Sequence, residues 1–157
     1  MQVCKGDLFE HFIGKHLPEV DAIAHVCNAQ GVMGSGFAKA VRELFPTAYA
    51  EYKKGDIIIP KCKLGTISYA EVRPDKFVFN VIAQEFYGYD GRRYLDYEAL
   101  YKGLERVKDA MLEQEVRRLG VPFMMGCDRA GGSWKVVSAM LESIFIPNQI
   151  SVLAVSL

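Results

Sequence analysis

The chain has 157 residues, and its 19 Lys and Arg balance its 19 Asp and Glu, which leaves a formal net charge of +0 at pH 7. This length supports one domain with a sizeable core, so we expect a single domain over residues 1–157. Duplex nucleic acid and anionic membrane surfaces both require a surplus of Lys and Arg, so neither is expected as a partner. The longest apolar runs are strand-sized, and the N-terminus does not resemble a secretion signal. The composition therefore predicts a folded cytoplasmic protein.

The cysteines and histidines do not form a metal-binding pattern. The four cysteines are Cys4, Cys27, Cys62 and Cys127, and the three histidines are His11, His16 and His25. No two cysteines stand in a C-x-x-C pair, and the histidines lack the spacing of metal ligands. We therefore expect reduced thiols, no metal and no cofactor.

The first half of the chain shows an alternation of strand and helix signals. Ala22–Cys27 is a short apolar run, typical of a strand buried on both faces. A helix is predicted from the apolar spacing of Phe37, Ala40, Val41 and Leu44. Pro46 ends that helix and a second short helix follows. Gly65–Val72 and Lys76–Ala83 are then predicted to form an antiparallel hairpin.

The second half continues the alternation. Asp96 is predicted to cap a long helix whose apolar stripe runs from Tyr97 to Leu119, with Gly120 closing it. Val121–Met125 is predicted as a buried strand, and Ile150–Val155 as the final strand. Between them a helix is indicated by Trp134, Val137, Met140, Leu141 and Ile144. This order predicts a three-layer α/β/α fold with a mixed sheet, whose ligand site lies at the carboxyl ends of the strands.

Two glycine-rich loops carry the candidate chemistry. Asn28–Gly36 and Gly126–Trp134 each lie between a buried strand and a helix, where glycines let backbone N–H groups approach an anion. Either loop alone could be a tight turn with a helix cap. Two of them in one small domain favour a phosphate-rich ligand, such as a pyrophosphate, held between them. A Walker loop and a complete G-x-G-x-x-G fingerprint are both absent, so ATP hydrolysis and hydride transfer are not expected.

Several short segments together resemble one family. They are Gly6-Asp7-Leu8, His25–Asn28 with Met33–Gly36, Tyr97–Leu100, and Gly126-Cys127 with Trp134. In this order and spacing they resemble the macrodomain, an ADP-ribose-binding module, over essentially the whole chain. The resemblance implies a single macrodomain with a three-layer α/β/α fold. The branch that holds terminal ADP-ribose protein glycohydrolase and the fungal ADP-ribose 1''-phosphate phosphatase looks similar, as do small phage macrodomain proteins.

The resemblance also implies ligand contacts. Asp7 would accept a hydrogen bond from the adenine amino group, with the Leu8 backbone N–H nearby, although a cap after the first strand would also explain Asp7. Asn28 and Gln30 would lie at the distal ribose, and turn chemistry is the alternative for both. The diphosphate would lie between Gly34, Ser35 and Gly36 on one side and the backbone amides of Gly131, Gly132 and Ser133 on the other.

The candidate catalytic residues depart from the glycohydrolase pattern. Gln84 stands where the glycohydrolase has a lysine, and Ala130 where it has its aspartate, so a lysine-linked covalent mechanism is not expected. Asp128, two residues earlier, would orient or deprotonate the attacking water. His25 is a candidate proton donor, and a hydrogen-bonded core histidine is the alternative.

The leading functional hypothesis is a hydrolase that removes the 1''-phosphate of ADP-ribose 1''-phosphate. One alternative is a non-catalytic protein that binds ADP-ribose, its derivatives or ADP-ribosylated proteins. Another is a hydrolase that removes carboxylate-linked ADP-ribose. The segment with Tyr87, Tyr89, Arg92 and Arg93 could form a lid over the distal ribose or a plain surface loop.

Overall fold

The computed structural model describes residues 1–88 and 90–157. The elements in chain order are β1 (Gln2–Lys5), α1 (Leu8–Phe12), β2 (Ala22–Asn28), α2 (Gly36–Leu44), α3 (Pro46–Lys53), η1 (Lys54–Ile57), η2 (Pro60–Lys63), β3 (Ile67–Arg73), β4 (Lys76–Gln84), α4 (Tyr97–Glu113), β5 (Arg118–Pro122), α5 (Trp134–Phe145), η3 (Ile146–Asn148) and β6 (Ser151–Ser156). The predicted hairpin is present as β3 and β4, which pair antiparallel. The predicted Ala22–Cys27 strand is present as β2.

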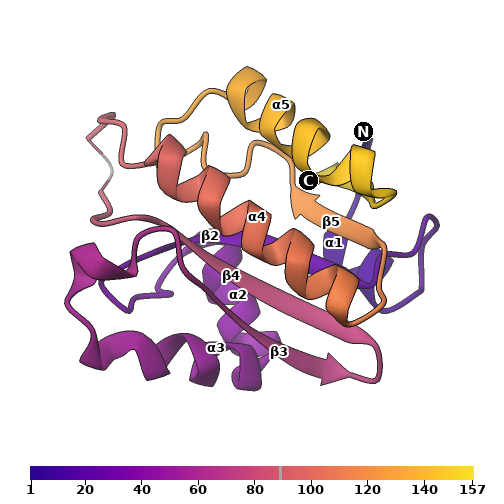
Figure 1. Ribbon diagram of the computed structural model, residues 1–157, viewed down its shortest axis with the longest axis horizontal. Coiled ribbons are helices and arrows are strands. Elements are labelled where there is room, and N and C mark those ends of the chain that lie inside the picture. The colour runs from indigo at the N-terminus through magenta and orange to yellow at the C-terminus, as the bar shows by residue number, and fades with distance from the viewer. Residues whose placement is uncertain (89) are drawn as a thin grey trace.

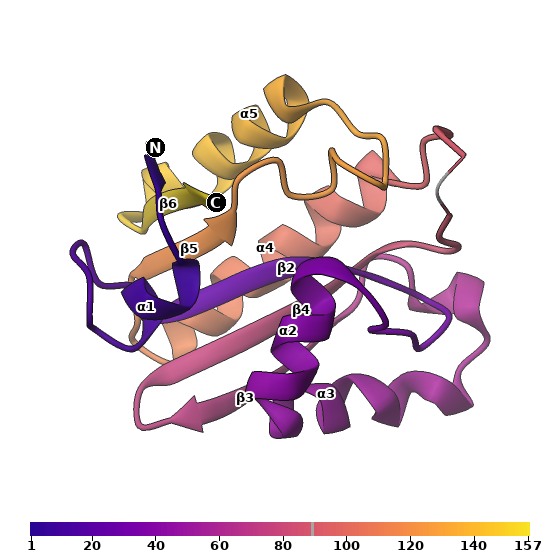
Figure 2. The ribbon, with the colours of Figure 1, turned by 180° about the vertical axis from the view of Figure 1, so that it is seen from behind.

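The six strands form one sheet in the order β1-β6-β5-β2-β4-β3. Every neighbouring pair is parallel except β3 and β4. Helices α4 and α5 cover one face of the sheet, and α1 and α2 cover the other (Figures 1 and 2). The predicted three-layer α/β/α fold with a mixed sheet is confirmed.

The core is divided between the two faces of the sheet. Alternate residues of β4 contribute to each side, because successive side chains of a strand point to opposite faces. Phe77, Phe79 and Val81 join the cluster that contains the buried residues of α4 and α5. Val78 joins the cluster that contains those of α1, α2 and α3. Both helical layers are thus held by apolar burial against the same central strand.

The end of the long helix differs from the sequence prediction. Helix α4 stops at Glu113, and Glu115 adopts a left-handed φ of 61°. The expected strand at Val121–Met125 is displaced, because β5 occupies Arg118–Pro122. Gly120 lies inside this strand instead of closing a helix. A Cβ at this position would lie 2.6 Å from Leu8 Cδ1, so no larger residue fits here without a shift of Leu8. The glycine therefore lets α1 pack closely on the sheet.

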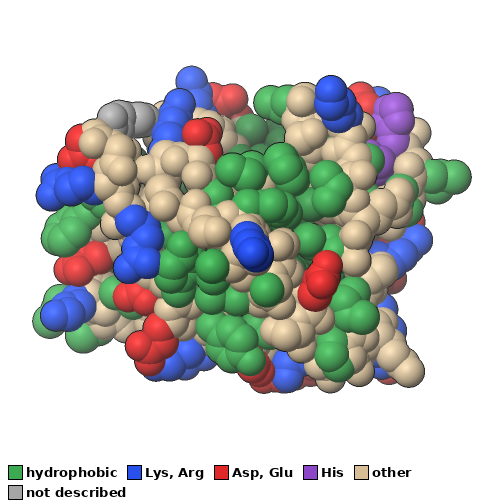
Figure 3. Space-filling model, turned by 90° about the horizontal axis from the view of Figure 1, so that it is seen from above, with side chains coloured by type: hydrophobic (Ala, Val, Ile, Leu, Met, Phe, Trp, Pro, Cys, Tyr) green, Lys and Arg blue, Asp and Glu red, His purple; other side chains and the backbone are tan. Residues whose placement is uncertain are grey.

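The surface carries charges of both signs. Viewed from above, apolar side chains gather in the middle of the face, and acidic and basic side chains are interspersed around it (Figure 3). In the described part of the chain, no helix is long and apolar enough to cross a membrane. Within residues 1–88 and 90–157, no cluster of three or more His, Cys, Asp or Glu residues could hold a metal ion.

Candidate functional site

A cavity of about 770 Å³ lies at the carboxyl ends of the parallel strands. Five strands contribute the segments that line it, and each contributes residues at or just beyond its last position. These residues include Gly6–Phe9 after β1, Asn28 at the end of β2, Gln84 at the end of β4, Pro122–Gly126 after β5 and Val155–Leu157 at the end of β6. This is the edge where open α/β sheets bind ligands.

The first glycine loop brings the N-terminus of α2 to the cavity. Gly34, Ser35 and Gly36, the residues expected at the diphosphate, all line it. Ser35 is the N-cap residue, but its side chain makes no capping hydrogen bond to the helix. Gly36 begins the helix with a φ of 60°, which favours glycine. The first turn of α2 therefore presents backbone N–H groups and the positive end of the helix dipole to a ligand.

Asn28 shapes this loop from within. Its Nδ2 donates to the Val32 carbonyl at 2.8 Å, and its Oδ1 accepts from the backbone N–H groups of Gln30 at 3.1 Å and Val32 at 3.2 Å. These contacts match the turn chemistry that was the alternative to ribose binding. Asn28 lines the cavity, whereas Gln30 does not, since its Nε2 donates to the Glu85 carbonyl at 3.0 Å.

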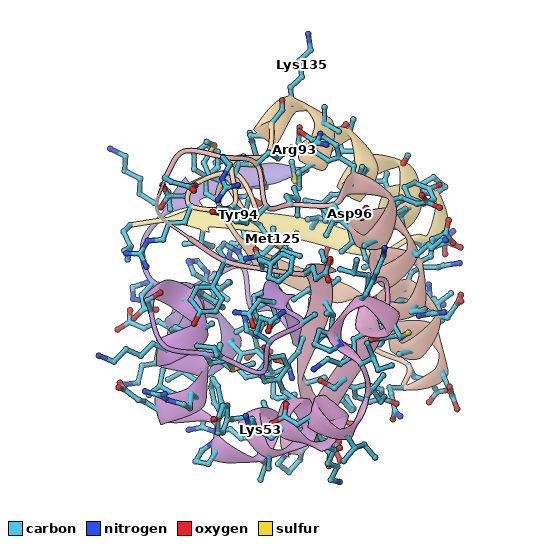
Figure 4. The ribbon with its side chains drawn as sticks, turned by 90° about the vertical axis from the view of Figure 1, so that its left-hand side faces the viewer. Lys53, Arg93, Tyr94, Asp96, Met125 and Lys135 are labelled. Carbon is cyan, nitrogen blue, oxygen red and sulfur yellow. The ribbon has the colours of Figure 1, made fainter. Side chains whose placement is uncertain are left out.

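Two residues of α3 hold the same loop from behind, and the sequence analysis did not identify them. The Tyr52 hydroxyl donates to the Asn28 carbonyl at 2.5 Å, and Lys53 Nζ donates to the Gly31 carbonyl at 3.0 Å. Burial raises the pKa of Tyr52 well above its usual value, so the hydroxyl stays protonated and remains a donor. Lys53 lies at the end of α3, far below the segment between β4 and α4, which we call the strap (Figure 4). The spacing of Tyr49 and Tyr52 indicates only a helix, so the sequence could not show that Tyr52 holds the loop.

The second glycine loop contributes only its first half to the cavity. Gly126, Asp128, Arg129 and Ala130 line the cavity, but Gly131–Ser133 do not. The backbone N–H groups of that second half already donate within the protein, to the Asp128 carbonyl, the Gly126 carbonyl and the Tyr97 hydroxyl at 3.3, 3.0 and 2.9 Å respectively. The expected diphosphate contacts of Gly131, Gly132 and Ser133 would require these internal hydrogen bonds to break, and they stay a prediction.

Close packing explains why the second half of that loop is rich in glycine. A Cβ at Gly131 would lie 2.9 Å from the Arg92 carbonyl oxygen, and one at Gly132 would lie 2.4 Å from Leu95 Cδ2. The strap between β4 and α4 passes directly over these glycines. These glycines are therefore required for close approach, but the approaching groups are the backbone of Arg92 and the side chain of Leu95.

His25 lies in the wall of the cavity and is 2% exposed. Its Nε2 is 2.7 Å from Asn80 Oδ1, and Asn80 Nδ2 donates to the Ala48 carbonyl at 3.1 Å. The amide orientation of Asn80 therefore assigns the proton of a neutral His25 to Nε2. Burial lowers the pKa of His25 to about 4, so the ring is neutral near pH 7. This geometry matches the core-histidine alternative better than a proton donor.

The carboxylates at the cavity come from two loops. Asp7 caps α1, with Oδ1 accepting from the Phe9 backbone N–H at 2.9 Å, so the capping alternative is present. Asp7 and Leu8 also line the cavity, next to the apolar side chains of Phe123 and Val155. Asp128 is exposed and lines the cavity from the second loop.

The candidate lid lies beside the cavity. Tyr87 and Gly88 line the cavity, while Tyr89 lies outside the described residues. Further along the strap, the Arg93 guanidinium lies 4.7 Å from the centroid of the Tyr97 ring. Figure 4 looks onto this strap, where Arg93 and Tyr94 lie close together above Met125. The strap thus lines the cavity at Tyr87 and Gly88 and packs against α4 at Arg93.

No protein-family model matches the sequence. The human ADP-ribose glycohydrolase OARD1 is 26% identical over 152 residues, which cover 94% of this chain and 86% of that protein. The ADP-ribose 1''-phosphate phosphatase of Neosartorya fischeri is 43% identical over 49 residues, which cover 31% of this chain but only 22% of the phosphatase.

Solved structures share the whole fold. A protein of unknown function from Bacteroides thetaiotaomicron superposes with a TM-score of 0.84 at 23% identity, over 99% of this chain and 97% of its own. A macrodomain protein from Streptomyces coelicolor has a TM-score of 0.76 at 27% identity, over 98% and 97%. Thermosipho africanus DarTG in complex with ADP-ribose matches at a TM-score of 0.73 and 17% identity, over 100% of this chain and 42% of its own.

The mixed sheet, the cavity at its carboxyl edge and the glycine turn at the α2 N-terminus define an α/β domain with one candidate ligand site. The sequence and structural relatives support the macrodomain family as the class of this chain. The cytoplasmic location and the likeness to phage proteins stay predictions.

Proposed function

We propose that the cavity binds ADP-ribose and that the protein hydrolyses a bond at the distal ribose, with ADP-ribose 1''-phosphate as its substrate. The observation that carries the proposal is the exposed carboxylate of Asp128 in the same cavity as the uncapped N-terminus of α2. One group holds an anion and the other activates a water, which are the two requirements of phosphoester hydrolysis. The match to fungal ADP-ribose 1''-phosphate phosphatases supports this choice of substrate.

In the proposed complex the adenine lies near Asp7, against the apolar wall that includes Phe123 and Val155. The diphosphate lies at the first turn of α2, where the backbone N–H groups bind its oxygens. The distal ribose lies toward Asn28 and the second loop. The cavity of about 770 Å³ is within the range of ligand pockets, so its volume suits a ligand of the size of ADP-ribose.

In the proposed reaction Asp128 accepts a hydrogen bond from a water and orients it toward the 1''-phosphorus. The new bond forms between the water oxygen and phosphorus, and the bond between phosphorus and the 1''-oxygen breaks. The proton lost by the water passes to Asp128, and the 1''-oxygen leaves as a hydroxyl after taking a proton from solvent. His25 is not needed as the donor, since it is neutral and hydrogen-bonded to Asn80.

A second activity, removal of carboxylate-linked ADP-ribose from proteins, is favoured by the human glycohydrolase relative, which matches over most of both chains. Against it, Gln84 at the lysine position donates its amide Nε2 to the Phe86 carbonyl at 2.9 Å and cannot form a covalent ribose adduct. We therefore place the phosphatase activity before the removal of carboxylate-linked ADP-ribose. Binding without turnover is the remaining outcome.

The test measures phosphate release from ADP-ribose 1''-phosphate beside ADP-ribose release from a glutamate-modified protein. Phosphate release alone supports the proposal, and ADP-ribose release alone transfers the assignment to the second activity. Thermal unfolding with ADP-ribose, AMP and NAD is measured in parallel, because a ligand that binds the native state raises Tm. A Tm increase with ADP-ribose and no turnover identifies a binding protein. No Tm increase and no turnover overturns the whole assignment.

A further inference from the structure

The charged side chains of the cavity are few. Among the described residues that line it, the carboxylates are Asp7 and Asp128, and the one Lys or Arg is Arg129. His25 adds no charge near neutral pH, because it is buried and hydrogen-bonded to Asn80. The side chains therefore give this cavity a net negative charge, although the ligand proposed above is itself an anion. Backbone dipoles and the positive charge of Arg129 oppose this repulsion.

Arg129 lies over the N-terminus of α2. Its Nη1 is 3.9 Å from the position that a Cβ would take on Gly36, the first residue of that helix. Gly36 follows β2 and Arg129 follows β5, and these two strands are neighbours in the sheet. The fold thus brings the guanidinium of one loop to the anion-binding turn of the other.

From this juxtaposition we infer that Arg129 is the phosphate-binding and specificity-determining cation of the site, which shares the ligand's phosphate oxygens with the first backbone N–H groups of α2. The inference rests on the proposed function and adds a residue that the macrodomain resemblance did not assign. In this proposal Arg129 takes the place of the backbone amides of Gly131, Gly132 and Ser133, which donate hydrogen bonds within the protein.

The chemistry of arginine suits this position. A guanidinium presents several N–H donors in a plane and can bind two phosphate oxygens in a fixed bidentate geometry, whereas a lysine ammonium acts as a point charge. Arg129 is also next to Asp128 in the chain, so its positive charge lowers the repulsion between the Asp128 carboxylate and the bound phosphates. Arg129 therefore selects for ligands with a phosphate at the α2 N-terminus and makes little difference to the binding of an uncharged nucleoside.

The experiment uses the full chain and three variants, Arg129→Gln, Arg129→Lys and Arg73→Gln. Arg73 is the matched control for the loss of one positive charge, because it is exposed at the end of β3, outside the cavity. The Kd for ADP-ribose is measured by calorimetry at about 50 mM and about 300 mM NaCl, because salt screens exposed charges. Thermal unfolding without ligand confirms that each variant folds.

We expect Arg129→Gln to bind ADP-ribose about 10- to 100-fold more weakly than the wild type, the usual loss for a hydrogen bond to a charged group. Its Kd should also change less with salt, while Arg129→Lys recovers part of the affinity and Arg73→Gln matches the wild type. If Arg129→Gln folds and keeps both the wild-type Kd and its salt dependence, the inference is wrong while ADP-ribose binding stands. If the wild type itself fails to bind ADP-ribose, the proposed function and the inference fall together.

Discussion

The hydroxyl of Tyr52 donates to the backbone carbonyl of Asn28 at 2.5 Å and lies 3.1 Å from the Oδ1 atom of the same residue. Helix α3 therefore fixes the point at which β2 ends and the first glycine loop begins. Lys53, the next residue, donates to the Gly31 carbonyl and pairs with Asp56. The loop that leads to the N-terminus of α2 is thus positioned by a helix whose residues do not line the cavity.

Tyr52→Phe tests this positioning. Loss of one buried hydrogen bond should lower the free energy of unfolding by about 1 kcal/mol, and the loosened loop should bind ADP-ribose several-fold more weakly. Urea unfolding and calorimetric Kd values provide the measurement. Tyr49→Phe is the matched control, because it removes the same hydroxyl from a half-buried neighbour on α3 that does not line the cavity. Equal Kd values for the two variants and the wild type would contradict the role of Tyr52.

Gly36 allows charge to be separated from backbone strain. Its φ of 60° disfavours any residue with a Cβ, so Gly36→Ala and Gly36→Glu should both lower Tm. Only Gly36→Glu should abolish ADP-ribose binding, because its carboxylate would occupy the anion position beside Arg129. Binding of ADP-ribose is measured for both variants below their Tm. A Gly36→Glu protein that binds as tightly as Gly36→Ala would show that this turn does not meet phosphate.

The sequence was most informative where one interaction type dominates. Burial on both faces made β2 recognisable, and alternation with a tight turn made the β3–β4 hairpin recognisable. It was least informative at the end of α4, because Val116 and Leu119 continue a helical spacing by coincidence. Leu119 instead pairs with Val152 of β6, a contact that depends on sheet order and not on local pattern.

The candidate site shows the same division. Its glycines were found because they have a conformational or packing reason that leaves a local signal, as at Gly36 and Gly132. The tertiary partners of the loops, Arg129 and Tyr52, left none. Arg129 reaches Gly36 across two neighbouring strands, and Tyr52 reaches Asn28 from a different helix. Such contacts follow from the assembled sheet, so a pattern within one segment could not predict them.

Asp128→Ala tests the proposed catalytic carboxylate. A residue that orients or deprotonates water contributes about 10²–10⁴-fold to the rate, so single-turnover phosphate release should fall by that order. The Kd for ADP-ribose should stay near the wild-type value or decrease, because the variant removes a negative charge from the cavity. Asp128→Asn, which keeps the shape and loses the charge, should be equally slow. An unchanged rate in both variants would remove Asp128 from the mechanism.

His25 makes the stability of the fold sensitive to pH. Burial lowers its pKa from 6.5 to about 4 in the folded state, whereas the unfolded chain keeps the ordinary value. Between these two values the unfolded state binds more protons than the folded state, so acidification favours unfolding. Stability present above pH 6.5 should therefore be lost as the pH falls toward 4, by about 3 kcal/mol in total for this residue.

His25→Gln removes this titration and can still donate a hydrogen bond to Asn80 Oδ1. We expect the variant to be less stable at pH 7, but to lose less stability than the wild type between pH 6.5 and pH 4. Urea unfolding at half-unit pH steps measures both curves. Parallel pH curves for His25→Gln and the wild type would mean that the folded protein accepts a proton on His25 as readily as the unfolded chain does. In that case His25 would again be a candidate proton donor in the reaction.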